Sequence, residues 1–103
     1  MTGRGGRLLL MPLLLWIEAC ATHVPRPTLE MARGNTTRLD ELRAGFEIYR
    51  AKCSGCHSLY AVEHCSPQEW PLRVDEMVDR KKVRFDPGER ERVLGYLCTA
   101  AAQ

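Results

Sequence analysis

The middle of the chain repeats apolar residues with the period of an amphipathic helix. From residue 38 to residue 53, apolar side chains recur three or four positions apart, and charged residues fill most of the positions between them. The apolar members of this stretch are Leu39, Leu42, Phe46, Ile48 and Tyr49. The pattern predicts a first helix over residues 38–53 with one buried face.

A second helix is predicted after Ser66-Pro67-Gln68-Glu69, which has the form of a capping box with proline at the first helical position. Pro71 is expected to delay or bend the first turn. The apolar residues of this helix are Trp70, Val74, Met77 and Val78. A loop over residues 58–65 separates it from the first helix.

Asp86-Pro87-Gly88-Glu89 repeats the capping signal and predicts the start of a third helix. The apolar side of that helix consists of Val93, Leu94, Tyr96 and Leu97. No alternating β pattern of any length and no internal repeat occurs in the sequence. We therefore predict an all-α domain of about three helices over residues 38–103.

The first 20 residues are typical of a secretory signal peptide. Arg4 and Arg7 precede a short apolar run over residues 8–17, and small residues follow the run. The run is too short to span a bilayer as a stable anchor. The sequence therefore predicts a signal peptide over residues 1–20 and an exported, periplasmic protein.

The cleavage site has two interpretations. Ile17-Glu18-Ala19-Cys20 resembles a bacterial lipobox, in which Cys20 is lipidated and becomes the first mature residue. Ala19-Cys20-Ala21 also has the small-x-small form of ordinary cleavage after Ala21. We favour the lipoprotein, because lipidation removes an otherwise unpaired exposed cysteine and tethers the protein to a membrane.

Residues 21–37 show no apolar period and contain prolines, a glycine, threonines and scattered arginines. This composition predicts a flexible linker. We expect His23 and Met31 to be solvated residues of that linker.

Composition narrows the function classes. A chain of 103 residues has room for one small domain, and its net charge of +2 indicates neither a nucleic-acid-binding protein nor an acidic tail. No Ser/His/Asp set, glycine-rich phosphate loop or pair of carboxylates suited to acid–base catalysis stands out. We therefore expect a protein that is not itself an enzyme.

Cys53-Ser54-Gly55-Cys56-His57 has the form of a c-type haem attachment site. Two thiols three positions apart on a helical turn can each add across one haem vinyl group, and His57 then reaches the iron. The motif predicts one covalent haem c per chain. A zinc site would require a second ligand pair at similar spacing, and a redox dithiol would require a βαβ pattern; the sequence has neither.

Met77 is the leading candidate for the second protein ligand of the iron. It is the only methionine after the haem motif, and a thioether favours Fe(II) and raises the reduction potential. The alternatives are that Met77 is a core residue, or that His64 supplies a second imidazole and a lower potential. The choice between Met77 and His64 stays open at this point.

Two other features have a structural and a functional interpretation. Cys65 and Cys98 are left over after the haem motif and are expected to pair in an oxidising compartment; otherwise they are two buried thiols.

A basic segment connects the second and third predicted helices, Arg80-Lys81-Lys82-Val83-Arg84. It is either a solvated face or a docking patch for an acidic redox partner.

Several of these residues together resemble the bacterial class I cytochrome c domain, over residues 40 to 100. Gly45, Tyr49 and Cys53, each four apart, correspond to that family's glycine, aromatic and first haem cysteine. Leu94-Gly95-Tyr96-Leu97 resembles its last helix; in the family the glycine of that helix lets the first and last helices cross closely, and aromatic residues from both helices pack at the crossing. Trp70, Val74 and Met77 are similar to the W-x-x-x-V-x-x-M signature of some short bacterial cytochromes c, some of which are parts of larger redox enzymes.

The resemblance implies a mono-haem electron carrier that transfers single electrons between redox partner proteins. It implies haem c held by Cys53, Cys56 and His57, with Met77 on the iron, either in a free protein or in the cytochrome subunit of a dehydrogenase or reductase. The alternatives are a ligand-binding or sensor haem protein with an open or displaceable iron site, and a zinc-bound structural module.

Overall fold

Helical segments account for most of the described chain. A computed structural model describes residues 23–53 and 59–103. In chain order the segments are α2 (Thr36–Cys53), the 3₁₀ turn η2 (Val62–His64), α3 (Trp70–Asp79) and α4 (Glu89–Ala101). Because these residues contain no strand, the prediction of an all-α domain with about three helices is confirmed for them.

Helix α2 begins at Thr36, slightly earlier than predicted, because Asn35 caps it. The Asn35 side-chain oxygen accepts a hydrogen bond from the Arg38 backbone N–H at 3.0 Å, which satisfies a donor that the first turn leaves unpaired. The helix ends at Cys53, as predicted. It therefore delivers the first motif cysteine at its C-terminal end.

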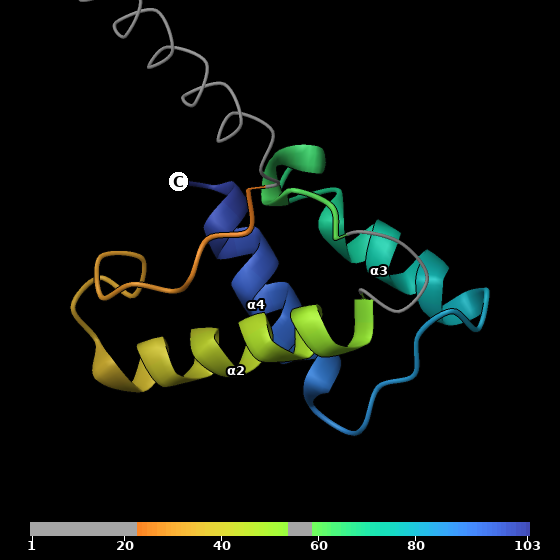
Figure 1. Cartoon of the computed structure of the whole chain (residues 1–103), viewed down its shortest axis with the longest axis horizontal. Helices are drawn as coiled ribbons and strands as arrows, with labels where there is room; N and C mark the ends of the chain where they lie inside the picture. The colour runs from red at the N-terminus through yellow and green to blue at the C-terminus, as the bar shows by residue number, and fades with distance from the viewer. Residues whose placement is uncertain (1–22, 54–58) are drawn as a thin grey trace, which may run out of the picture.

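Helices α2 and α4 cross and form the centre of the domain (Figure 1). At the crossing, Gly45 lies against the α4 backbone: a Cβ built on it would stand 2.0 Å from the Arg92 carbonyl oxygen. Next to it, Phe46 and Tyr96 pack edge to face with ring centroids 5.4 Å apart. The close crossing thus depends on Gly45 and not on Gly95, which has open space around its Cα.

The capping box before α3 forms, but the helix starts later than predicted. The Glu69 backbone N–H donates to Ser66 Oγ, and the Ser66 N–H donates to a Glu69 carboxylate oxygen, both at 3.2 Å. Residues 67–69 form a turn, and α3 begins at Trp70 with Pro71 in its first turn. Pro67 is therefore not the first helical residue, and Pro71 takes the early helical position where a missing N–H does no harm.

Only half of the second capping signal forms at the start of α4. The Glu89 carboxylate accepts a hydrogen bond from the Asp86 N–H at 2.8 Å, but no cap side chain returns a bond to the helix. Gly88 precedes the helix with φ at +84°, a conformation that a residue with a Cβ adopts at a cost.

Residues 23–35, which we call the N-terminal strap, pack against the helical domain, so the prediction of a flexible linker is wrong for this segment. Ala32 is fully buried and Met31 nearly so, in the same core as α2 and α4. A tight turn presents them to the core: the Met31 N–H donates to Thr28 Oγ1 at 3.2 Å, and Arg33 and Gly34 both have positive φ. The strap is the orange segment in Figure 1.

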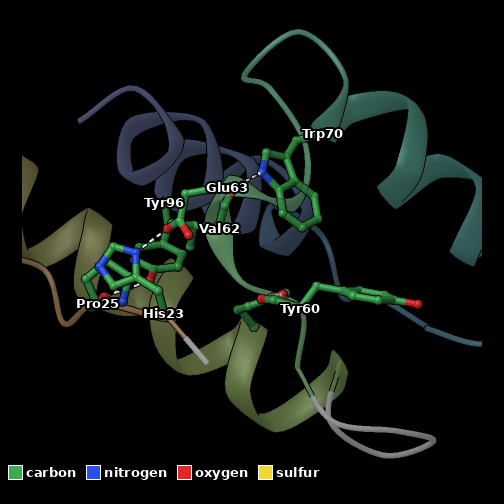
Figure 2. A network of polar contacts seen from close by, with 8 residues as sticks. His23, Pro25, Tyr60, Val62, Glu63, Trp70 and Tyr96 are labelled. Atoms are coloured by element: carbon green, nitrogen blue, oxygen red, sulfur yellow. Dashed lines mark hydrogen bonds and ion pairs between the residues drawn. The ribbon is translucent and has the colours of Figure 1, made fainter. Parts of the chain in front are cut away.

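Long-range hydrogen bonds fix the first residues of the strap (Figure 2). The Tyr96 hydroxyl donates to the Pro25 carbonyl at 2.6 Å, and the Val62 N–H donates to the His23 carbonyl at 3.0 Å. The exposed His23 ring also contacts the Glu63 carboxylate. The strap escaped prediction because these polar contacts join residues 39 or more positions apart, and local periodicity does not detect contacts of that kind.

The signal peptide, the cleavage site and Cys20 lie outside the described residues. Within residues 23–53 and 59–103, none of the helices combines the length and the apolarity that crossing a bilayer requires.

Candidate functional site

A cavity of about 400 Å³ lies between the C-terminal end of α2, the loop that carries η2, and α3 with the segment after it. Its size is in the range of small-molecule and cofactor sites. The residues that line it are Lys52, Cys53, Tyr60, His64, Cys65, Trp70, Arg73, Glu76, Met77, Arg80, Lys82 and Val83.

Three residues singled out from the sequence line this one cavity. Cys53 closes it from the end of α2, Met77 from α3, and His64 from η2. Cys56 and His57 lie outside the described residues. The structure therefore brings the first motif cysteine together with both candidate sixth ligands, from segments that are far apart along the chain.

The Cys53 thiol is held in a partly buried position. Burial raises the pKa of the thiol to about 11, so that it is protonated at neutral pH. Thiols that act as redox nucleophiles have lowered pKa values and basic neighbours that stabilise the thiolate. This environment suits a sulfur that forms a neutral thioether better than one that works as a thiolate.

Met77 and His64 differ in how they meet the cavity. The exposed His64 ring stacks on Tyr60, with ring centroids 4.3 Å apart and an angle of 9° between the planes. His64 would have to leave this stack to point inward. Met77 is partly buried on the wall of α3, and its unbranched side chain can adjust without breaking a contact of this kind. Of the two cavity residues, Met77 is therefore the one that is not held in a ring stack.

Two hydrogen bonds fix the loop that forms one wall of the cavity. The Tyr49 hydroxyl donates to the Tyr60 carbonyl at 2.6 Å, and the Trp70 indole N–H donates to the Val62 carbonyl at 2.9 Å (Figure 2). The loop is thus held between α2 and α3. The sequence indicated Tyr49 and Trp70 as helix and signature residues, but it gave no sign that their polar atoms anchor this loop.

Basic side chains surround the cavity. Among its described lining residues, Lys52, Arg73, Arg80 and Lys82 are basic, and Glu76 is the single acid. Arg73 and Glu76 form an exposed ion pair at 3.4 Å. The rim is therefore net positive and complements a ligand that carries carboxylate groups.

The two leftover cysteines are free thiols in the structure, and the predicted disulfide between them is not formed. Cys98 Sγ instead donates to the Pro67 carbonyl at 3.3 Å. Cys65 is buried on the cavity wall, and burial raises the pKa of its thiol. Neither thiol is therefore primed for reaction by its surroundings.

No group of three or more His, Cys, Asp or Glu residues suited to a metal ion occurs among residues 23–53 and 59–103. Since Cys56 and His57 lie outside these ranges, the haem and zinc interpretations of the motif are not separated by this finding. Comparisons of the chain with protein-family models, curated proteins and solved structures found no match.

Proposed function

We propose that this protein is a periplasmic c-type cytochrome that carries one haem c and transfers single electrons between redox partner proteins. The observation that carries the proposal is that residues far apart in the sequence line the same cavity. The motif Cys53-Ser54-Gly55-Cys56-His57 begins on the wall of a cavity that Met77, on a separate helix, also lines.

The residues around the cavity fit such a group. Cys53, with Cys56, would hold the porphyrin by thioether bonds, and His57 and Met77 would bind the iron. Trp70 and Val83 are apolar residues of the cavity wall, and the basic rim complements the two carboxylates that a haem carries. Haem iron supplies the one-electron chemistry, since it cycles between Fe(II) and Fe(III).

The chain's own residues would set the conditions for that chemistry. Tyr49 and Trp70 hold the cavity wall in place, so little rearrangement would accompany a change of charge in the cavity. A thioether from Met77 raises the potential relative to a second histidine. With His57 and Met77 both bound to the iron, the protein would carry electrons without binding a substrate.

The test is the absorption spectrum of the matured protein and of its Met77→Ala variant. We expect the ferric protein to show a weak far-red band from methionine ligation, and we expect the band to vanish in Met77→Ala but to persist in His64→Ala. A protein without covalent haem after denaturing electrophoresis would refute the proposal. A high-spin spectrum that changes when carbon monoxide is added to the reduced protein would instead support a ligand-binding or sensor function.

The proposal includes a membrane anchor at Cys20. Only residues 21 and 22 separate Cys20 from His23, whose carbonyl is already bonded to Val62. At about 3.6 Å per extended residue, a lipid on Cys20 would hold His23, the first residue of the strap, within about 11 Å of the lipidated cysteine. We expect the full-length protein to incorporate a labelled fatty acid and to fractionate with membranes, and we expect Cys20→Ser to lose both properties. An unlabelled, fully released wild-type protein would contradict the anchor and leave the haem proposal intact.

A further inference from the structure

A half-buried lysine beside the motif joins three segments of the chain. Lys52 Nζ donates to a Glu89 carboxylate oxygen at 2.5 Å and to the Arg84 carbonyl at 2.9 Å, and it lies 3.9 Å from an Asp86 carboxylate oxygen. Glu89 is at the same time bonded to the Asp86 N–H at 2.8 Å. We call these four residues, Lys52, Arg84, Asp86 and Glu89, the Lys52 clamp.

The clamp ties the C-terminal end of α2 to the segment between α3 and α4, residues 80–88, which we call the connector. Lys52 immediately precedes Cys53, and both line the cavity. The connector supplies Lys82 and Val83 to the same cavity, and Val83 is buried. One side chain therefore spans from the first motif cysteine to the part of the wall that follows the Met77 helix.

The charges in the clamp are well matched. The side chains of Lys52 and Glu89 are only 30% and 17% exposed, so water competes little for their hydrogen bonds. The hydrogen bond from Lys52 holds the pKa of Glu89 below its usual value, and the same bond raises the pKa of Lys52. Both groups are therefore charged across the physiological pH range, and the contact is a charge-assisted hydrogen bond.

We propose that Lys52 is a positioning residue, which keeps the connector closed over the cavity and so holds Met77 in place to bind the iron. The connector contains no helix or strand of its own that would hold it there. Lys52 contacts the connector at the Arg84 carbonyl and at Asp86, and it contacts Glu89 where the connector joins α4, so the clamp ties the connector to the end of α2 beside Cys53. The part of this inference that concerns the iron rests on the proposed function; the part that concerns the closed connector does not.

The experiment compares the wild type with Lys52→Met, which removes the donor of the central hydrogen bond, and with Glu89→Gln, which removes the negative charge of its acceptor. Lys81→Met is the matched control, because it removes an exposed lysine of the same connector that does not line the cavity. Lys52→Arg, which keeps the charge and can still donate, tests for rescue. Hydrogen exchange of the backbone amides of residues 82–86 and 88 is measured on each purified protein as it is isolated.

We expect amide exchange in the connector to be several-fold faster than in the wild type in Lys52→Met and in Glu89→Gln. The double variant should exchange no faster than either single variant. Exchange in Lys81→Met and Lys52→Arg should be close to that of the wild type. In the haem-loaded protein, we expect the far-red methionine band to be lost at a lower temperature in both clamp variants, well before the helical circular dichroism changes. A merely structural role would move the two transitions together.

Two results would overturn the inference: connector exchange in Lys52→Met that equals the wild type, or clamp variants whose effects simply add in the double variant. A protein that proved to carry no haem would remove the spectroscopic readout and the proposed function. The exchange readout would still decide whether Lys52 closes the connector.

Discussion

Single residues determine how closely the two central helices approach each other. Gly45 lies within reach of the α4 backbone, whereas Gly95, one turn along α4, faces open space. The two glycines look equivalent in the sequence, since both sit inside helices beside aromatic residues. They are distinguished only by what the partner helix places in front of them.

Replacing Gly45 by alanine should destabilise the fold by about 3 kcal/mol or more, because the added Cβ meets the Arg92 carbonyl oxygen, a backbone atom that cannot turn aside. Gly95→Ala is the control and should stabilise the protein by up to about 1 kcal/mol, since alanine is the better helix former. Urea unfolding of both variants measures the difference. An equally stable Gly45→Ala protein would contradict the observed crossing.

At the scale of elements, the strap contributes more than its sequence indicates. It places Met31 and Ala32 in the core, and Arg26 lies 5.8 Å from the centre of the Phe46 ring on α2. The strap also provides the acceptor for the hydroxyl of Tyr96, which is a residue of the core. The helical domain and its N-terminal strap therefore form one folding unit.

A chain that lacks residues 23–34 should be less stable by about 2–4 kcal/mol. Burial of a methionine side chain contributes about 1.5–3 kcal/mol, and the hydrogen bond from Tyr96 about 1 kcal/mol. Thermal unfolding of the truncated and full chains measures this loss. Leu29→Ala, which removes an exposed strap residue, should leave the melting temperature unchanged; an equal fall in this variant would argue against burial as the cause.

At the scale of the whole molecule, two buried tyrosines link stability to pH. Burial raises the pKa values of Tyr49 and Tyr96 above their ordinary value of about 10. The folded state therefore binds these protons more tightly than the unfolded state does. Their contribution to stability is fully present below pH 10 and decreases as the pH rises from there through the folded-state pKa values.

Urea unfolding between pH 8 and pH 11.5 should show this fall, and Tyr49→Phe should reduce its slope because one linked proton is removed. At pH 8 the same variant should be destabilised by about 1 kcal/mol, since the Tyr60 carbonyl loses its donor. A Tyr49→Phe slope equal to that of the wild type would show that other groups govern the alkaline loss of stability.

The sequence by itself determined the helices of this protein. Helical periodicity predicted the three helices, with α2 ending at Cys53, and the spacing of Cys53, Cys56 and His57 is the basis of the haem proposal. These features depend on residues a few positions apart, so a single chain read in order contains them. The start of α3 was misplaced because competing local signals, Pro67 and Pro71, both suit a first helical turn.

Only the tertiary structure decided which distant residues meet. It placed Cys53, His64 and Met77 on one cavity, buried Met31, left Cys98 against Pro67, and joined Lys52 to Glu89. Such contacts depend on how helices pack across long sequence separations, where apolar burial is non-directional and many pairings suit the same pattern. A residue's type indicates that it can be buried or paired. The packing of the whole chain determines which residues become its neighbours and partners.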